Sequence, residues 1–428
     1  MELNTQPTLM PNLIINNTRM QDDFEQISRI GLKPNGGICR PALSKEDLEA
    51  RAWFADQIEE AGFLVKDDDA GNLSAVLRCD NPEARTLLIG SHLDTVQNAG
   101  RYDGALGMIS ALECLRTIQE SRIRLPVHLE VIDFTDDEGT WMPMFGSMSL
   151  AGQLPEGALK DTNGDKSTFR AALTRAGINP DHIHRAKRHP KSLMGYIELH
   201  VEQGIRLEQA NRQIGIVERI VGRKSYRVVF HGQAGHAGTA SMMERRDALQ
   251  GAALFIIQAH DLVRQEFPEG VLNCGNVQVK PGAMTIIPNE ATVIMEARHI
   301  NEEDLAAMEL ALGGLAQTCA ENWRLGFDFS CTNHIPVALM NPQIIHGIEQ
   351  ACNEVGASYI HLSSYASHNA QVMSRVVPGG MLFIPSVNGV SHNPEEFSRW
   401  EDVITGTNVL LHSIIHLALN SPPHTTQP

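Results

Sequence analysis

The sequence predicts an α/β fold built from two domains, and three observations carry this prediction. Segments typical of strands alternate with segments typical of helices through the first half of the chain, as in a sheet covered by helices. From about Val221 the order changes to β-α-β-β-α-β, which is complete in itself as a ferredoxin-like unit. A chain of 428 residues is also too long for one compact core. We therefore predict one domain over 1–220 and 336–428, interrupted by an inserted domain over 221–335.

The individual elements follow from local patterns. Ser44-Lys45-Glu46-Asp47 resembles a capping box and starts a helix that runs to Ala61. Apolar runs and helical spacing predict, in the first domain, strands over 73–77, 86–90 and 127–134 and helices over 105–118, 342–355 and 400–419. In the inserted domain they predict strands over 225–230, 271–279, 291–298 and 326–331 and helices over 246–265 and 301–323. The tail from Asn420, rich in Ser, Pro and Thr, is expected to be disordered.

Composition excludes several classes of protein. The net charge of −16 argues against a nucleic-acid partner, because phosphate binding requires clustered Lys and Arg. We find no run of about 18 apolar residues that could span a bilayer, and the N-terminus lacks the basic and apolar regions of a signal peptide. The seven cysteines are scattered without a C-x-x-C pair, which favours reduced thiols in a cytoplasmic protein over disulfides or a zinc knuckle.

Metal-ligand residues stand where apolar strand segments end. Imidazoles and carboxylates brought together at the ends of parallel strands are what a hydrolytic metal site requires. One such residue alone is more often a solvated loop residue or a helix cap, but five in this order favour a metal site. Asp94, two residues after His92 in an extended segment, faces the same side and is placed to orient the imidazole. The five candidates are His92, Asp103, Glu138, His200 and His392.

Three motifs are the most specific in the chain: Gly-Ser-His-Leu-Asp-Thr-Val at 90–96, Glu-Leu-His-Val-Glu-Gln-Gly at 198–204 and Gly-His-Ala-Gly-Thr at 235–239. Through them the chain resembles, over nearly its whole length, the metal-dependent amidase family of peptidase M20 type. That family contains allantoate amidohydrolase, N-carbamoyl-L-amino acid hydrolase and the yeast-type β-ureidopropionase. The resemblance implies a metallopeptidase-like catalytic domain with an inserted ferredoxin-like domain that serves as a lid and forms a homodimer.

The same resemblance implies roles for the candidate residues. The five metal ligands would hold two divalent ions, zinc or manganese, with Asp103 as the bridge. Asp94 would orient His92, and Asp137, immediately before Glu138, would be the general base for the attacking water.

Residues that contact the substrate are also implied. His236 would reach the site from the partner subunit and stabilise the tetrahedral oxyanion; alternatively, it only satisfies a Gly-rich turn. Gln203 would contact a substrate amide. Arg298 would bind a substrate carboxylate, for which a planar guanidinium suits better than an ammonium group; alternatively, it forms a surface salt bridge.

The chain departs from the family pattern at functional positions. Asp137 stands where the family has a glutamate, and Thr285 stands where it has a substrate-binding asparagine. Ser367-His368-Asn369 replaces the usual Gly-His-Asp, and 139–145 lacks the usual Arg-Phe pair. We keep Thr285 and His368 as candidate substrate-binding residues. With the metal ligands intact and the pocket altered, we expect a changed substrate and a retained activity.

The expected function is metal-assisted hydrolysis of a linear amide or ureido C–N bond in a small substrate that carries a carboxylate. No G-x-S-x-G elbow and no cysteine cluster indicates a nucleophilic mechanism instead. Two alternatives stay open: an aminoacylase or dipeptidase on the same scaffold, and a non-catalytic metal-binding relative.

Overall fold

The computed structural model describes residues 13–159 and 166–420, which form two compact units. The first unit contains the chain up to Glu218, Leu339–Leu362 and the chain from His368 onward. The second contains Arg219–Ala338 and Ser363–Ser367. The tail that we expect to be disordered lies, beyond Asn420, outside the described residues.

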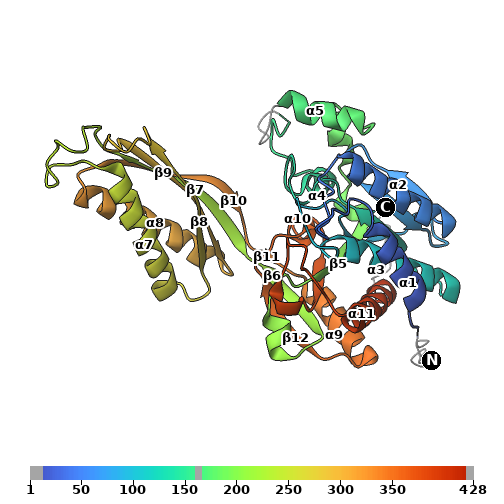
Figure 1. The fold of residues 1–428 in the computed structure, drawn as a ribbon. Helices are drawn as coiled ribbons and strands as arrows, with labels where there is room; N and C mark the ends of the chain where they lie inside the picture. Colours follow the sequence, from blue (N-terminus) through green and yellow to red (C-terminus); the bar gives the residue numbers. More distant parts are fainter. Residues whose placement is uncertain (1–12, 160–165, 421–428) are drawn as a thin grey trace, which may run out of the picture. The chain divides into compact units, whose positions relative to one another are not determined.

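The first unit is built on a nine-stranded mixed sheet with the order β1-β2-β4-β3-β5-β13-β6-β11, in which β12 pairs with β6 (Figure 1). β3 is parallel to β4 and to β5, and β5 is parallel to β13. The carboxyl ends of these four strands therefore meet at one edge of the sheet, where the loops that follow them can gather polar side chains. The strands are β1 (Leu64–Asp67), β2 (Leu73–Leu77), β3 (Thr86–Ser91), β4 (His128–Asp133), β5 (Leu193–Val201), β6 (Ile214–Ile220), β11 (Ala338–Leu339), β12 (Tyr359–Ser364) and β13 (Gly379–Ile384).

Two helices, α3 (Ala105–Ser121) and α11 (Trp400–Leu419), supply much of the apolar core and are buried along most of their length. We predicted no apolar run able to span a bilayer, but α11 is long and apolar enough to do so by length and composition. Because 72% of its apolar window is buried inside the protein, we interpret α11 as a core helix. The other helices of this unit are α1 (Asn17–Ile27), α2 (Lys45–Glu60), α4 (Phe145–Ala151), α5 (Lys166–Arg175), α6 (Arg206–Ala210), α9 (Pro342–Val355) and α10 (Asn369–Met373).

Side-chain caps begin α2, where the sequence predicts one, and also α9. The Ser44 hydroxyl accepts the Asp47 N–H at 3.2 Å at the start of α2. The Asn341 side chain accepts the Gln343 N–H at 2.9 Å at the start of α9. Each cap gives a partner to a backbone donor that the first helical turn leaves free. Both α9 and α11 begin and end at the predicted residues.

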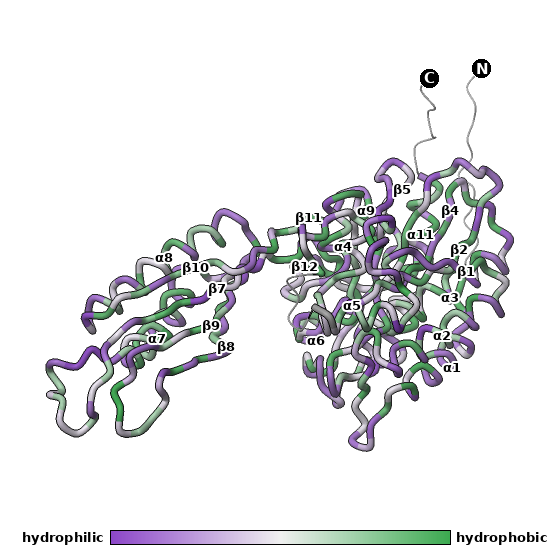
Figure 2. Tube along the Cα trace, turned by 90° about the horizontal axis from the view of Figure 1, so that it is seen from above, coloured by the Kyte–Doolittle hydropathy of each residue, from purple (hydrophilic) through white to green (hydrophobic). Residues whose placement is uncertain are grey.

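The second unit is a four-stranded antiparallel sheet with two helices. Its chain order β7-α7-β8-β9-α8-β10 and sheet order β10-β7-β9-β8 are those of a ferredoxin-like unit. Helices α7 and α8 lie on one face of this sheet (Figure 1) and share a core with its buried side chains. Figure 2 shows hydrophobic and hydrophilic residues interspersed along both helices, as expected for helices with one buried face. The elements are β7 (Gly222–His231), α7 (Ala248–Glu266), β8 (Val271–Lys280), β9 (Glu290–His299), α8 (Glu302–Asn322) and β10 (Gly326–Ile335).

A short segment from the C-terminal part of the chain also belongs to the second unit. Ser363–Ser367 begins at the end of β12, and the Val221 N–H donates to the Ser364 carbonyl at 2.9 Å. The strands β6, β12 and β13 are not among the sequence predictions. Two of them, β12 and β13, lie between Pro336 and Trp400, where the sequence predicted only a helix.

Candidate metal centre

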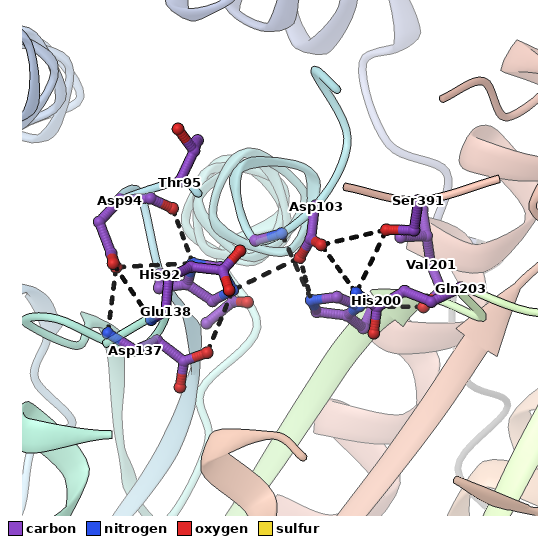
Figure 3. A network of polar contacts seen from close by, with 12 residues as sticks. His92, Asp94, Thr95, Asp103, Asp137, Glu138, His200, Val201, Gln203 and Ser391 are labelled. Carbon is purple, nitrogen blue, oxygen red and sulfur yellow. Dashed lines mark hydrogen bonds and ion pairs between the residues drawn. The ribbon is translucent and has the colours of Figure 1, made fainter. Parts of the chain in front are cut away.

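The five candidate ligands converge at the carboxyl edge of the first unit's sheet. Ligand atoms of His92, Asp103 and His200 lie within 4.8 Å of one another, and so do those of Asp103, Glu138 and His392. Asp103 Oδ1 lies 3.1 Å from His200 Nε2 and 3.6 Å from His92 Nε2, whereas Asp103 Oδ2 lies 3.1 Å from His392 Nε2. Figure 3 shows the Asp103 carboxylate between His92 and His200. A carboxylate that presents a different oxygen to each group has the geometry of a bridging ligand.

Backbone carbonyls determine which nitrogen of each buried imidazole is available. His92 Nδ1 lies 2.9 Å from the Asp94 carbonyl oxygen, and His200 Nδ1 lies 2.9 Å from the Val201 carbonyl oxygen. A carbonyl can only accept, so Nδ1 carries the proton in both rings. Nε2 of each ring faces Asp103 and is the nitrogen that could bind a cation, although Nε2 of His200 also accepts the Gly104 N–H at 3.3 Å.

The turn before α3 brings the backbone against the first ligand. Gly104 has φ +67°, and a Cβ built on it would lie 2.4 Å from His92 Cε1. A side chain at this position would therefore be strained and would collide with the imidazole. Glycine allows the ring of His92 and the carboxylate of Asp103 to lie close together.

Asp94 contacts more than the imidazole that we expected it to orient. The nearest oxygen to His92 Nδ1 is the Asp94 carbonyl, while the Asp94 carboxylate lies 3.6 Å from the same nitrogen. That carboxylate accepts the backbone N–H groups of Asp137 and Glu138, each at 3.2 Å. Asp94 thus contacts His92 and also holds the acidic loop that follows β4.

The acidic loop has strained backbone and perturbed carboxyl groups. Asp136 has φ +56°, and its Oδ2 accepts the backbone N–H groups of Trp141 and Met142. Burial raises the pKa of Asp137, although His92 opposes the shift. Burial, and then the nearby Asp103 carboxylate, raise the pKa of Glu138 to about 8. In both carboxyl groups, the nearby imidazoles do not fully offset the cost of burying a negative charge.

The opposite shifts occur at the bridging position. Burial opposes ionisation of Asp103, but three nearby imidazoles outweigh it and hold its pKa well below the usual range. Burial also opposes the charged form of His92, and carboxylates, first that of Asp137, raise its pKa well above normal. The imidazoles therefore act as the positive partners of Asp103 when no cation is bound.

These residues fit a pair of cations. Glu138 Oε1 is buried and accepts no hydrogen bond within the described residues. A buried carboxylate oxygen without a donor is costly, and a divalent cation would supply the missing partner. Imidazole nitrogens and carboxylate oxygens are also the ligands used for zinc and manganese.

Residues 88–416 match peptidase family M20/M25/M40. The chain belongs to this family. The resemblance seen in the sequence motifs is thereby confirmed, and it extends to proteins of similar length. N-carbamoyl-L-amino acid amidohydrolase of Geobacillus stearothermophilus is 33% identical over 407 residues, which cover 95% of this chain and 99% of the relative. Ureidoglycolate hydrolase of Arabidopsis thaliana is 30% identical over 423 residues, which cover 96% and 89%.

A solved structure of the same kind has the same fold. The crystal structure of an amidase of the hydantoinase/carbamoylase family from Burkholderia multivorans superposes with a TM-score of 0.86 at 29% identity. The match covers 96% of this chain and 100% of that structure. The mixed α/β fold of this M20 chain is therefore that of its family.

Gln203 is the candidate substrate-binding residue that lies in the centre itself. Its backbone has φ +57°, and its N–H donates to Ser386 Oγ at 3.0 Å. Its side-chain amide donates to Asp103 Oδ2 at 2.7 Å and to Ser391 Oγ at 3.2 Å. The side chain of Gln203 therefore binds the carboxylate of Asp103, which belongs to both groups of ligands.

His368 lies beside the first group of ligands. Its ring centroid is 4.6 Å from that of His200, with the rings nearly edge to face. Burial, together with the nearby His200, holds the pKa of His368 well below its usual range. The low pKa favours the neutral imidazole, which can donate one hydrogen bond and accept another.

His236, Thr285 and Arg298 belong to the second unit. His236 lies in an isolated bridge with Ile286, and its Nδ1 accepts the Gly238 N–H at 3.1 Å. The Thr285 carbonyl accepts a backbone N–H from the same turn. Arg298 Nε and Nη2 both donate to Glu296 Oε1, at 2.9 and 2.7 Å.

One buried acid at the centre was missed by the sequence analysis. Glu198 is fully buried, and its Oε2 accepts the Ala370 N–H at 2.9 Å at the start of α10. Burial raises its pKa to about 7. Its position two residues before His200 in β5, and thus on the same side of the strand, is the signal that could have identified it.

Proposed function

We propose that this M20 enzyme hydrolyses a linear amide or ureido C–N bond of a small molecule in a metal-dependent reaction. The observation that carries the proposal is Asp103, whose two oxygens each face a separate group of ligand atoms. The similarity to an N-carbamoyl-L-amino acid amidohydrolase and to a ureidoglycolate hydrolase supports a substrate with a ureido group.

The proposed cofactors are two divalent ions, zinc or manganese. His92, Asp103 and His200 hold one ion, and Asp103, Glu138 and His392 hold the other. When bound, such a pair polarises the scissile carbonyl and lowers the pKa of the attacking water.

Asp137 is the proposed general base. Its Oδ2 lies 3.5 Å from His92 Nε2, and its Oδ1 is buried without a hydrogen-bond donor, so the carboxylate faces the centre with one oxygen free. In this role it takes the proton of the attacking water and returns it to the leaving nitrogen. The neighbouring Asp136 is less suited, because its carboxylate already accepts two backbone N–H groups.

Substrate recognition is assigned to both units. Gln203 and His368 lie in the first unit, beside the ligands, and offer an amide and a neutral imidazole to the substrate. Arg298 binds the substrate carboxylate and, to do so, exchanges its hydrogen bonds to Glu296 for bonds to the substrate. His236 stabilises the oxyanion, and Thr285 in the adjoining turn contacts the substrate.

We also propose that the second unit forms a homodimer. Its edge strand β8 carries exposed Val271 and Val277, which are 45% and 42% accessible. An uncovered apolar edge strand is suited to pairing with a second chain. The substitution Val277→Lys should shift the protein toward the monomer, which sedimentation analysis measures. Activity should also be lost if His236 acts from the partner subunit. We place the enzyme in the cytoplasm, where its seven free thiols stay reduced.

The function is tested by turnover. Metal-free protein is reconstituted with zinc or manganese and assayed against N-carbamoyl amino acids, allantoate, ureidoglycolate and N-acylated amino acids. Hydrolysis of a ureido substrate that depends on added metal is the expected result. Preference for acylated amino acids would instead favour an aminoacylase. Metal uptake without turnover of any amide would favour a non-catalytic binding protein.

A further inference from the structure

Glu396 is a buried acid that lies behind the metal centre. It follows His392 by four residues and is only 3% exposed. Its Oε1 accepts the backbone N–H groups of Tyr102 and Asp103, at 2.8 and 3.0 Å. These two residues are separated from it by 294 and 293 positions in the sequence, so the contacts join two distant loops.

The second oxygen of Glu396 reaches the same ligand by another route. Oε2 accepts the Ser391 hydroxyl at 2.9 Å, and the same hydroxyl lies 3.2 Å from Asp103 Oδ2. Glu396 therefore accepts the backbone N–H of Asp103, and its side chain shares the single hydrogen of the Ser391 hydroxyl with the Asp103 carboxylate. Ser391 and Glu396 lie in the same loop as His392. The carboxyl group of Glu396 therefore connects Asp103 to the loop that carries His392.

Packing leaves room for this carboxylate only because the facing residue is glycine. A Cβ built on Gly100 would lie 2.3 Å from Glu396 Cβ and 2.6 Å from its Oε1. The loop from Gly100 to Asp103 is thus shaped around Glu396. Two backbone donors and one hydroxyl therefore give hydrogen-bond partners to both oxygens of this buried carboxyl group.

We propose that Glu396 is a positioning residue that clamps the loop 100–103 to the loop 391–396. The clamp holds Asp103 and His392 at a fixed separation, while His92 and His200 are held independently at the ends of β3 and β5. The site formed by Asp103, Glu138 and His392 therefore depends on Glu396 more than the other site does. This inference rests on the proposed function only for the assignment of the two groups as metal sites.

The test compares metal binding by variants of the full chain. Glu396→Ala removes the acceptor for two backbone N–H groups and for Ser391. Loss of an outer contact of this kind typically costs about 10–100-fold in metal affinity. We expect that loss in one of the two binding steps and a clearly smaller loss in the other, because Asp103 is common to both groups of ligands. Glu396→Gln keeps an acceptor for both backbone donors, so it should restore most of the weakened step.

The experiment is a calorimetric titration of metal-free protein with Zn²⁺ or Mn²⁺ alone. The matched control is Glu395→Ala, because Glu395 is the adjacent acid but is exposed; this variant should bind as the wild type does. Circular dichroism and thermal unfolding of each metal-free variant give the fold readout. If Glu396→Ala does not fold, Ser391→Ala removes the hydroxyl that contacts Glu396, Asp103 and the Gln203 amide, and it should weaken the same step by a smaller factor.

The outcomes separate the two proposals. Two binding steps of wild-type affinity in Glu396→Ala would overturn the clamp and leave the proposed function intact. Equal weakening of both steps with a lower melting temperature would also overturn it, because a merely structural residue has that effect. Wild-type protein that binds no divalent cation would instead refute the metal-dependent function itself.

Discussion

Asp137, which we propose as the general base, is one methylene group shorter than the glutamate that the sequence resemblance leads us to expect. A base displaced by about an ångström can lose on the order of a hundredfold in rate if nothing compensates. Here the Asp137 N–H is held by the Asp94 carboxylate at 3.2 Å, which fixes the backbone beside the ligands. This contact holds the residue that we propose as the base in a fixed backbone position.

Asp137→Asn keeps the shape of the side chain and removes its basicity. We expect kcat to fall by at least about a hundredfold, because the proton of the attacking water has no acceptor. Metal content, measured by atomic emission, should stay at the wild-type level. Asp137→Glu is the control and should retain measurable activity. Turnover by Asp137→Asn at the parental rate would place the base elsewhere, with Asp136 as the first residue to examine.

Arg298→Lys tests the substrate carboxylate. The lysine keeps the charge but loses the planar fork, and a charge-assisted hydrogen bond contributes about 1.5–3 kcal/mol, so KM should rise about tenfold or more. Steady-state kinetics on an N-carbamoyl amino acid measures this change. Glu296→Gln is the companion variant; it removes the carboxylate that now occupies Arg298 and should lower KM. An unchanged KM in Arg298→Lys would mean that no acid group is bound there.

At the scale of elements, strand ends and one helix start determine where the ligands lie. β3 ends directly before His92, and His200 is the last residue but one of β5. α3 begins directly after Gly104. The parallel pairing of β3 with β5 brings the two imidazoles to a centroid separation of 5.9 Å. The loops that carry Asp103 and His392 need further contacts, because no strand fixes them.

Gly104→Ala should disrupt the centre while leaving the fold in place. The new methyl group would collide with the His92 ring, and we expect metal affinity to fall at least about tenfold. The matched control is Gly62→Ala, because Gly62 has a similar φ of +76° but open space around its Cβ. Gly62→Ala should lose about 1–2 kcal/mol to its positive φ, and Gly104→Ala should lose more, because φ 67° with ψ −58° lies outside the left-handed helical region. Calorimetry of metal binding should detect a defect only in Gly104→Ala, and equal affinities in both variants would refute the collision.

At the scale of the whole molecule, buried charges connect the sheet of the first unit to its helices. Asp133, at the end of β4, accepts the Leu93 N–H at 2.8 Å and lies 3.5 Å from Arg51 Nε on α2. Burial raises the pKa of Asp133 to about 6, although Arg51 opposes the shift. The folded chain therefore takes up a proton at this carboxyl at a higher pH than the unfolded chain does.

This shift predicts how stability depends on pH. A carboxyl whose pKa is raised by folding stabilises the protein fully at low pH, and that contribution is lost as the pH rises through the folded pKa of about 6. Asp133→Asn does not ionise, so the variant should gain stability relative to the wild type by up to about 3 kcal/mol between pH 4 and pH 7. Urea unfolding of both metal-free proteins at several pH values measures the difference. A difference that does not change with pH would contradict the raised pKa.

Much of the fold could be predicted because the signals are local. A side-chain cap and an apolar stripe are contained within one helix, so α2, α9 and α11 lie where the pattern placed them. The strands β6, β12 and β13 carry weaker signals, because their stability comes from pairing with strands that are distant in the sequence. The buried helix α11 shows the reverse problem, since its composition alone does not distinguish a core helix from a membrane span.

The sequence by itself determined the family, the fold class and the types of ligand, because short motifs specify the chemistry of a site. Only the tertiary structure decided how those groups meet. It brings one oxygen of Asp103 toward His200 and the other toward His392, and it pairs Arg298 with Glu296. It also places Glu396 against a loop 293 positions away. The physical reason is that sequence spacing constrains neighbours along the chain, whereas distances between separate loops depend on the packing of the whole unit.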